Sequence, residues 1–139
     1  MLRAPHWILG LLIATGCQHF DRASECRAIA RSVNPELKTL AETLGKRSPF
    51  SREEYRNASA KYAQSAKQLQ NLFPRDADLA RLTRELRDNM LALSRSCDRF
   101  AAAEMGQGPW VDPNAAHDLE NLGSRHHSLV TAVDRHCVE

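Results

Sequence analysis

Cysteine and histidine are the residue types in this chain best suited to nucleophilic, redox or metal chemistry. The sequence has four cysteines and six histidines, and four of the histidines fall near the C-terminal end, at His117, His126, His127 and His136. A metal site needs ligands three or four residues apart on one helical face, or ligands that converge from different helices. These four histidines are separated by nine, one and nine residues. The spacing predicts no metal site, and we expect no cofactor.

The sequence carries no recognisable catalytic motif. It has no glycine-rich phosphate loop after a strand, no Cys-x-x-Cys pair, no haem-attachment motif and no Ser-His-Asp order. The acidic residues Asp76, Asp78, Glu85 and Asp88 are spaced like ordinary surface charges. We therefore expect a protein that is not an enzyme.

Residues 1–17 have the layout of a secretory signal. One positive residue, Arg3, precedes an uncharged run from Trp7 to Gly16, and this run ends in small residues directly before Cys17. The run is about half as long as the roughly 20 residues that a membrane-spanning helix needs. A cleaved signal, residues 1–16, is therefore predicted in place of a membrane helix.

The segment Ala14-Thr15-Gly16-Cys17 closely resembles the lipobox of bacterial lipoproteins, with Ala14 where leucine is commonest. The resemblance implies attachment of diacylglycerol to the Cys17 sulfur, cleavage before Cys17 and acylation of the new amino terminus. Two or three acyl chains anchor a protein firmly. Gln18 stands where inner-membrane lipoproteins commonly have Asp, which points to the outer membrane and a domain facing the periplasm. The alternative is an ordinary signal peptide cleaved near Ala14.

Composition limits the kind of domain that the rest of the chain can form. Removing residues 1–16 from the 139 leaves 123, a single-domain length. Nineteen basic and 17 acidic residues give a formal net charge of +2, which provides no case for nucleic-acid binding. Aromatic residues make up only 6%, and Ala, Leu, Arg and Glu favour helices. We expect a lipidated tether over 17–22 and an all-α domain over 23–139.

Four segments carry apolar residues at alternating spacings of three and four, which is typical of helices that bury one stripe. The predicted helices span about 22–45, 51–73, 76–105 and 112–137. Short connections favour antiparallel neighbours, so the prediction is a four-helix up-down-up-down bundle. The alternative is a three-helix bundle with a frayed fourth segment.

Local signals refine these helices. Pro35 lies inside the first, but the apolar phase continues across it, so we expect a kinked helix and not two separate ones. Ser51 and Glu54 form a capping box at the start of the second. Asp112, followed by a proline, begins the fourth. Gly123 within the fourth costs about 1 kcal/mol relative to Ala, with no evident reason in the sequence.

The bundle topology selects a cysteine pair. Cys26 lies near the start of the first helix, and an up-down-up-down bundle returns Cys137 to the same end. Cys97 lies about 20 residues into the third helix, roughly 30 Å from that end. A disulfide needs Cα atoms within about 7 Å. We therefore predict a Cys26–Cys137 disulfide and a buried Cys97 thiol.

A five-residue tether spans at most about 18 Å, so a lipid at residue 17 would hold the bundle close to a membrane. The lipid-facing end would then hold Phe20, residues 72–74 and Cys137. The far end would bring together the three residues Phe50, Met105 and Trp110. Aromatic residues and Met are enriched at interfaces, so these three are the candidate partner contact. The alternative, that Phe50 and Trp110 form a lid over the core, is the commoner role of such residues and is favoured.

The layout as a whole is similar to small bacterial lipoproteins whose helical bundle opens with a Cys-containing helix, here Cys26-Arg27-Ala28-Ile29, and closes on a Cys. The resemblance brings no activity with it. The main hypothesis is a non-catalytic, lipid-anchored envelope protein that offers a surface to another periplasmic component. One alternative is a bundle that binds a metal or small apolar molecule around His126, Cys97 and Met90. A further alternative is an inhibitor or immunity lipoprotein.

Overall fold

The structure is a computed structural model. It describes the backbone of residues 14–33, 35–44 and 50–139, and within these ranges the side chains from Arg22 onward. In chain order the elements are α1 (Ala14–Ser32), α2 (Pro35–Thr43), α3 (Arg52–Gln70), α4 (Ala77–Ala102), the short 3-10 helix η1 (Gly108–Trp110) and α5 (Pro113–Val138). Every element of the described part is helical, which confirms the all-α prediction. Residues 1–13, most of the predicted signal peptide, lie outside the described residues.

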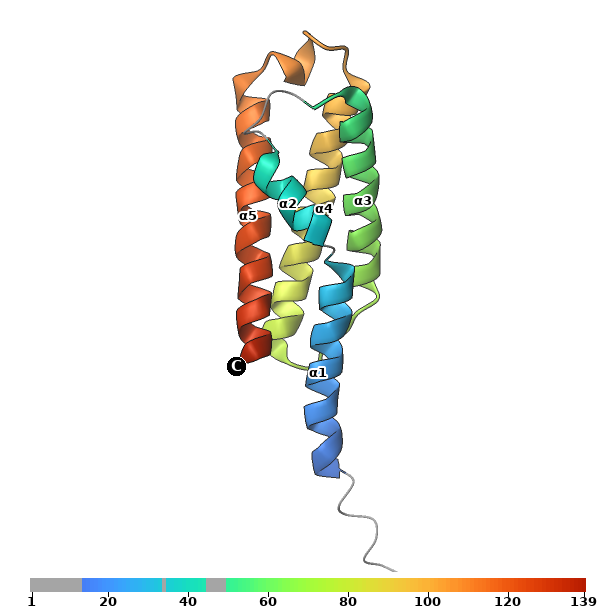
Figure 1. Cartoon of the computed structure of the whole chain (residues 1–139), viewed down its shortest axis with the longest axis vertical. Helices are drawn as coiled ribbons and strands as arrows, with labels where there is room; N and C mark the ends of the chain where they lie inside the picture. The colour runs from blue at the N-terminus through green and yellow to red at the C-terminus, as the bar shows by residue number, and fades with distance from the viewer. Residues whose placement is uncertain (1–13, 34, 45–49) are drawn as a thin grey trace, which may run out of the picture.

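The helices run alternately up and down the long axis of the molecule, as predicted (Figure 1). α1 and α2 together form the first of the four antiparallel segments of the bundle, and α3, α4 and α5 form the other three. The α3–α4 end of the bundle comprises residues 22–26, 71–76 and 136–139. The α4–α5 end comprises residues 50–55 and 100–112. The alternative with a frayed fourth segment is wrong, because α5 is continuous over 26 residues.

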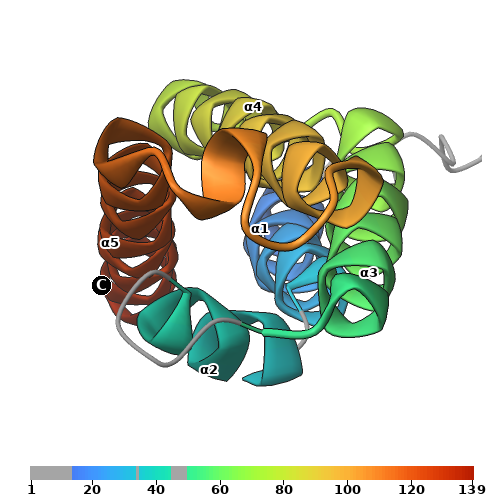
Figure 2. The ribbon, with the colours of Figure 1, turned by 90° about the horizontal axis from the view of Figure 1, so that it is seen from above.

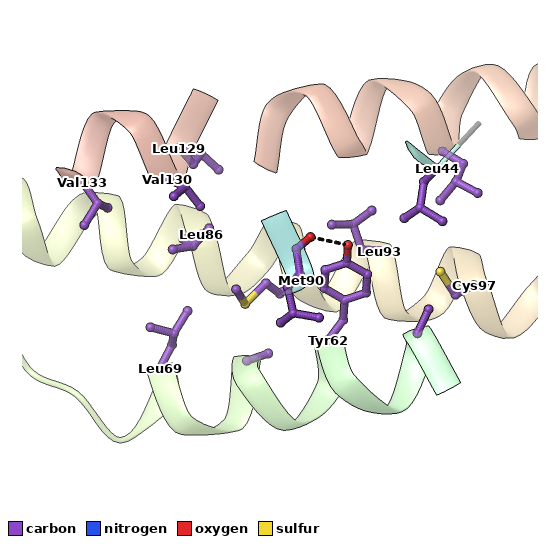
Figure 3. Packing of buried hydrophobic residues seen from close by; sticks show 14 of the residues in the cluster. Leu44, Tyr62, Leu69, Leu86, Met90, Leu93, Cys97, Leu129, Val130 and Val133 are labelled. Atoms are coloured by element: carbon purple, nitrogen blue, oxygen red, sulfur yellow. Dashed lines mark hydrogen bonds between the residues drawn. The ribbon is translucent and has the colours of Figure 1, made fainter. Parts of the chain in front are cut away.

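The α1–α2 segment differs from the predicted kinked helix, because α1 ends at Ser32 and a separate helix, α2, begins at Pro35. Proline donates no backbone hydrogen bond and crowds the preceding turn, and it disfavours helical dihedrals in the residue before it. Two hydroxyls of α3 bind carbonyls on either side of the break. Ser65 donates to the carbonyl of Ser32, and Tyr62 donates to that of Leu37 at 3.1 Å (Figure 3). These contacts hold the two pieces in place.

The predicted ends of the other helices shift by a few residues. α3 ends at Gln70 instead of near residue 73, and α4 ends at Ala102 instead of near 105. α1 begins at Ala14, so residues 17–22, expected as a tether, are helical. The predicted capping box is present: the Ser51 hydroxyl accepts from the Glu54 N–H at 3.1 Å, and the Glu54 carboxylate accepts from the Ser51 N–H at 2.6 Å.

The core lies between α3, α4 and α5, and α1 and α2 contribute to it (Figure 3). It consists mainly of the predicted apolar stripes. Its largest fully buried side chains are Tyr62, Ile29, Leu37, Leu44, Leu69, Leu79, Leu86, Met90, Leu93, Leu119, His126 and Cys97.

The position of α2 explains the glycine at residue 123. α2 crosses the bundle and packs on α5 (Figure 2). A Cβ atom at Gly123 would overlap the carbonyl oxygen of Ala41 in α2. Only glycine lets the two backbones approach this closely. Glycine at this position lowers helix stability by about 1 kcal/mol, but it is what allows α2 to dock on α5.

Gly123→Ala tests this contact, because helix propensity and packing predict opposite signs. Propensity alone would stabilise the protein by about 1 kcal/mol. Since the added methyl group would meet backbone, which cannot rotate away, we expect a net loss of about 1–3 kcal/mol in the free energy of unfolding. Urea denaturation measures it. The exposed neighbour provides the control, Ser124→Ala, which should change stability by less than about 0.5 kcal/mol. A stabilised Gly123→Ala protein would contradict the contact.

Candidate functional site

At the α3–α4 end, Cys26 of α1 and Cys137 of α5 form a disulfide. Their Cα atoms are 5.9 Å apart, and 111 residues separate them in sequence. The pairing confirms the one predicted from the topology. Cys97 is a free thiol and is fully buried. Burial, with a contribution from Asp98, raises the pKa of Cys97 to about 12, so its sulfur is protonated and unsuited to nucleophilic chemistry at neutral pH.

Asp76 is not the ordinary surface charge that its spacing indicated. Its carboxylate accepts from the Leu79 N–H at 2.8 Å, which caps α4. The same oxygen lies 2.9 Å from His136 Nε2 on α5. The Leu79 hydrogen bond and the nearby His136 hold the pKa of Asp76 below its usual range. An aspartate directly before the first apolar residue of a helix is a signal for a cap, but nothing local indicates the histidine 60 residues away.

Two further hydrogen bonds tie α1 into this end of the bundle. The Arg22 guanidinium donates to the carbonyl of His136 at 2.6 Å. The Arg75 N–H donates to the Glu25 carboxylate at 3.0 Å. The disulfide and these contacts thus join α1, the α3–α4 connection and the end of α5. Sequence reasoning found the disulfide and missed the polar contacts around it.

The α4–α5 end holds an aromatic cluster centred on Tyr55. The Tyr55 ring stacks on Phe100 at a centroid distance of 4.8 Å and meets Phe50 and Trp110 edge-on at 5.6 and 5.3 Å. The indole N–H of Trp110 donates to the carbonyl of Phe100 at 2.9 Å. Phe50 and Trp110 are half-buried against the core, as a lid requires.

Met105, the third predicted contact residue at the α4–α5 end, differs from Phe50 and Trp110. Its side chain is 59% exposed, and that of nearby Val111 is 63% exposed. The structure therefore brings Phe50 and Trp110 together around Tyr55 and leaves Met105 in solvent. Met105 and Val111 are thus two exposed apolar side chains at this end of the bundle.

A buried polar pair joins α4 and α5 in the middle of the core. His126 is fully buried, and its Nδ1 lies 3.2 Å from the side-chain oxygen of Asn89. The Asn89 amide group donates to the carbonyl of Leu122 at 3.1 Å. Burial, with a contribution from the nearby His127, lowers the pKa of His126 to about 4, so the ring is neutral at neutral pH. Its other nitrogen, Nε2, has no hydrogen-bond partner among the described residues.

Neither a metal centre nor a membrane span is found in the described part of the chain. Within residues 14–33, 35–44 and 50–139, no group of three or more His, Cys, Asp or Glu residues could hold a metal ion. No helix in these ranges is long and apolar enough to cross a membrane. Comparison of the chain with protein-family models, curated proteins and solved structures gave no match. A function must therefore be inferred from the chain's own residues.

Proposed function

We propose that this protein is a non-catalytic helical bundle of the bacterial cell envelope, anchored by lipid at Cys17 to the outer membrane and facing the periplasm. The observation that carries the proposal is the segment Ala14-Thr15-Gly16-Cys17 at the end of an apolar run too short to span a membrane. The Cys26–Cys137 disulfide supports it, because disulfides persist in oxidising compartments such as the periplasm.

The length of α1 bears on how the anchor would hold the bundle. The backbone at Cys17 lies near the start of α1, five residues before Arg22. Five helical residues rise about 8 Å, compared with the about 18 Å that an extended tether could reach. A lipid on Cys17 would therefore keep the α3–α4 end within about a nanometre of the bilayer. The α4–α5 end, with Met105 and Val111, would face away and offer a surface to another envelope protein.

The alternative of a ligand in the core has less support. His126, Cys97 and Met90 are each fully buried among other core side chains. Burial also keeps Cys97 protonated, and a metal would need its thiolate. The exposed apolar side chains of Met105 and Val111, at the end that holds the aromatic cluster, favour a protein contact instead.

Labelling of cells with a radioactive fatty acid tests the anchor. The wild-type protein should take up the label and fractionate with membranes, because the lipid is attached to the Cys17 sulfur. Cys17→Ser should lose both the label and the membrane association. Cys97→Ser provides the matched control and should keep the label. Label that persists in Cys17→Ser, or that never enters the wild type, would overturn the proposal.

The same cells test the partner contact by crosslinking in the intact envelope. Crosslinked species present in the wild type should be lost in Cys17→Ser, because the partner depends on the anchor, and in Met105→Asp, because a charge opposes apolar contact. Crosslinks that are unchanged in Met105→Asp would place the contact elsewhere on the bundle.

A further inference from the structure

Two of the most exposed apolar side chains lie at the α3–α4 end. Phe73, in the α3–α4 connection, is 86% exposed, and Val138, next to the C-terminal residue, is 88% exposed. The connection is held in place, since the Arg75 N–H donates to Glu25 of α1 and Asp76 contacts His136 of α5. Phe73 is thus presented to solvent from an ordered turn. An exposed phenylalanine is apolar enough to enter the boundary between headgroups and acyl chains, where surface-bound proteins place Trp, Phe and Leu.

Arginines accompany Phe73. Phe73, Pro74, Arg84 and Arg87 line one surface hollow of about 200 Å³ between the end of α3 and the start of α4. Arg84 is exposed, whereas the Nε and Nη2 groups of Arg87 already donate to the Asp88 carboxylate at 3.1 and 2.9 Å. A guanidinium group binds phosphate with two parallel hydrogen bonds, so the Arg84 side chain suits a phospholipid headgroup.

The path of α1 places this surface near the proposed anchor. α1 leaves the bundle at the α3–α4 end (Figure 1). Glu25, which contacts the α3–α4 connection, is eight residues from Cys17, or about 12 Å along the helix. The headgroup layer of a bilayer is about 5–7 Å thick on each side. An upright bundle would therefore hold Phe73 above the headgroups, and a bundle that leans toward the α3–α4 connection would bring Phe73 into them.

We propose that the bundle leans on the bilayer surface, with the Phe73 side chain in the headgroup region and Arg84 facing lipid phosphates. The inference rests on the proposed lipid anchor at Cys17. One phenylalanine would bind a membrane only weakly on its own, but the anchor supplies a high local concentration. The second contact would fix the tilt of the bundle and hence the direction in which Met105 and Val111 point.

Fluorescence quenching tests the contact. Signal cleavage removes Trp7 and leaves Trp110, at the opposite end, as the single tryptophan. Lipidated Phe73→Trp protein, purified from membranes, is reconstituted in vesicles of anionic phospholipid with nitroxide-labelled acyl chains. The introduced tryptophan should lose fluorescence and emit at shorter wavelength than in detergent. Wild-type Trp110 should be unaffected. Val111→Trp, which adds a tryptophan at the other exposed end, is the matched control and should not be quenched.

The outcomes separate this inference from the anchor proposal. A fatty-acid label without quenching in Phe73→Trp would overturn the leaning contact and leave the anchor intact. Absence of the label would overturn the anchor and, with it, the argument for a bilayer at this surface. A spectral shift that occurs without lipid and grows with protein concentration would assign the surface to a second copy of the chain, against the proposal. Equal quenching of the introduced tryptophan after Arg84→Gln is added to Phe73→Trp would overturn the role of the arginine.

Discussion

Replacement of Cys26 and Cys137 together by alanine should lower the free energy of unfolding by about 4.8 kcal/mol. The disulfide joins residues 111 apart, and the chain-entropy model gives this value for a loop of that length at 25 °C. The loss is a large fraction of the about 5–15 kcal/mol that stabilises a typical domain. For a domain of this size, the melting temperature should fall by roughly 15–20 °C.

Calorimetry of three samples checks this prediction: oxidised wild type, reduced wild type and the double variant. The two samples without a disulfide should melt together, well below the oxidised protein. Cys97→Ala is the control, because it removes the buried free thiol and should still respond to reductant as the wild type does. An unchanged melting temperature of the wild-type protein after complete reduction would contradict the prediction.

Reduction should act first on α1. This helix is bound to the rest of the molecule through the disulfide, the hydrogen bonds of Arg22, Glu25 and Ser32, and the buried Ile29 side chain. Hydrogen exchange in reduced protein should therefore rise more for α1 than for the central residues of α3 and α4. Such local opening would also loosen the link between Cys17 and the bundle.

Acidification from pH 6.5 to pH 4 should remove about 3 kcal/mol of stability because of His126. Burial lowers the pKa of His126 to about 4, whereas the side chain in an unfolded chain titrates near 6.5. The unfolded state therefore binds a proton first as the pH falls. The contribution is fully present above pH 6.5 and is lost progressively as the pH approaches 4.

His126→Gln removes this titration and retains a side chain that can hydrogen-bond to Asn89. Its free energy of unfolding, measured by urea denaturation, should vary less between pH 6.5 and pH 4 than that of the wild type. The exposed His117 provides the control, and His117→Gln should keep the wild-type profile. Asp76 acts at lower pH, because its carboxyl pKa is lowered and its stabilising effect is lost only as the pH falls below the ordinary range. An unchanged slope in His126→Gln would refute the assignment.

Local sequence signals predicted most of the helices. The apolar spacing located the bundle helices, the capping box at Ser51 and Glu54 marked the start of α3, and Asp112 marked the start of α5. These signals are readable because they depend on residues within one or two turns. The Cys26–Cys137 pairing was also predictable, because the number of helices determines which end each cysteine reaches.

The predictions that failed depend on neighbours distant in sequence. Pro35 indicated a kink, but the chain breaks there, and the second piece packs on α5 where Gly123 leaves room. Asp76 looked like a surface charge until the fold placed it beside His136. Phe50 and Trp110 pack on Tyr55, whereas Met105 stays exposed at the same end and its partner contact stays a prediction.

By itself, therefore, the sequence determined the helix phases, the caps, the cysteine pair and the lipobox-like segment before the bundle. Tertiary structure decided where α2 docks, which polar groups meet at the α3–α4 end and which aromatic residues close the other end. The physical reason is how far apart along the chain the interacting residues lie. Helix formation and capping are decided by contacts within a few residues, whereas the contact of α2 with α5 and the polar contacts at the α3–α4 end join residues 50 to 114 apart and exist only once the helices are packed.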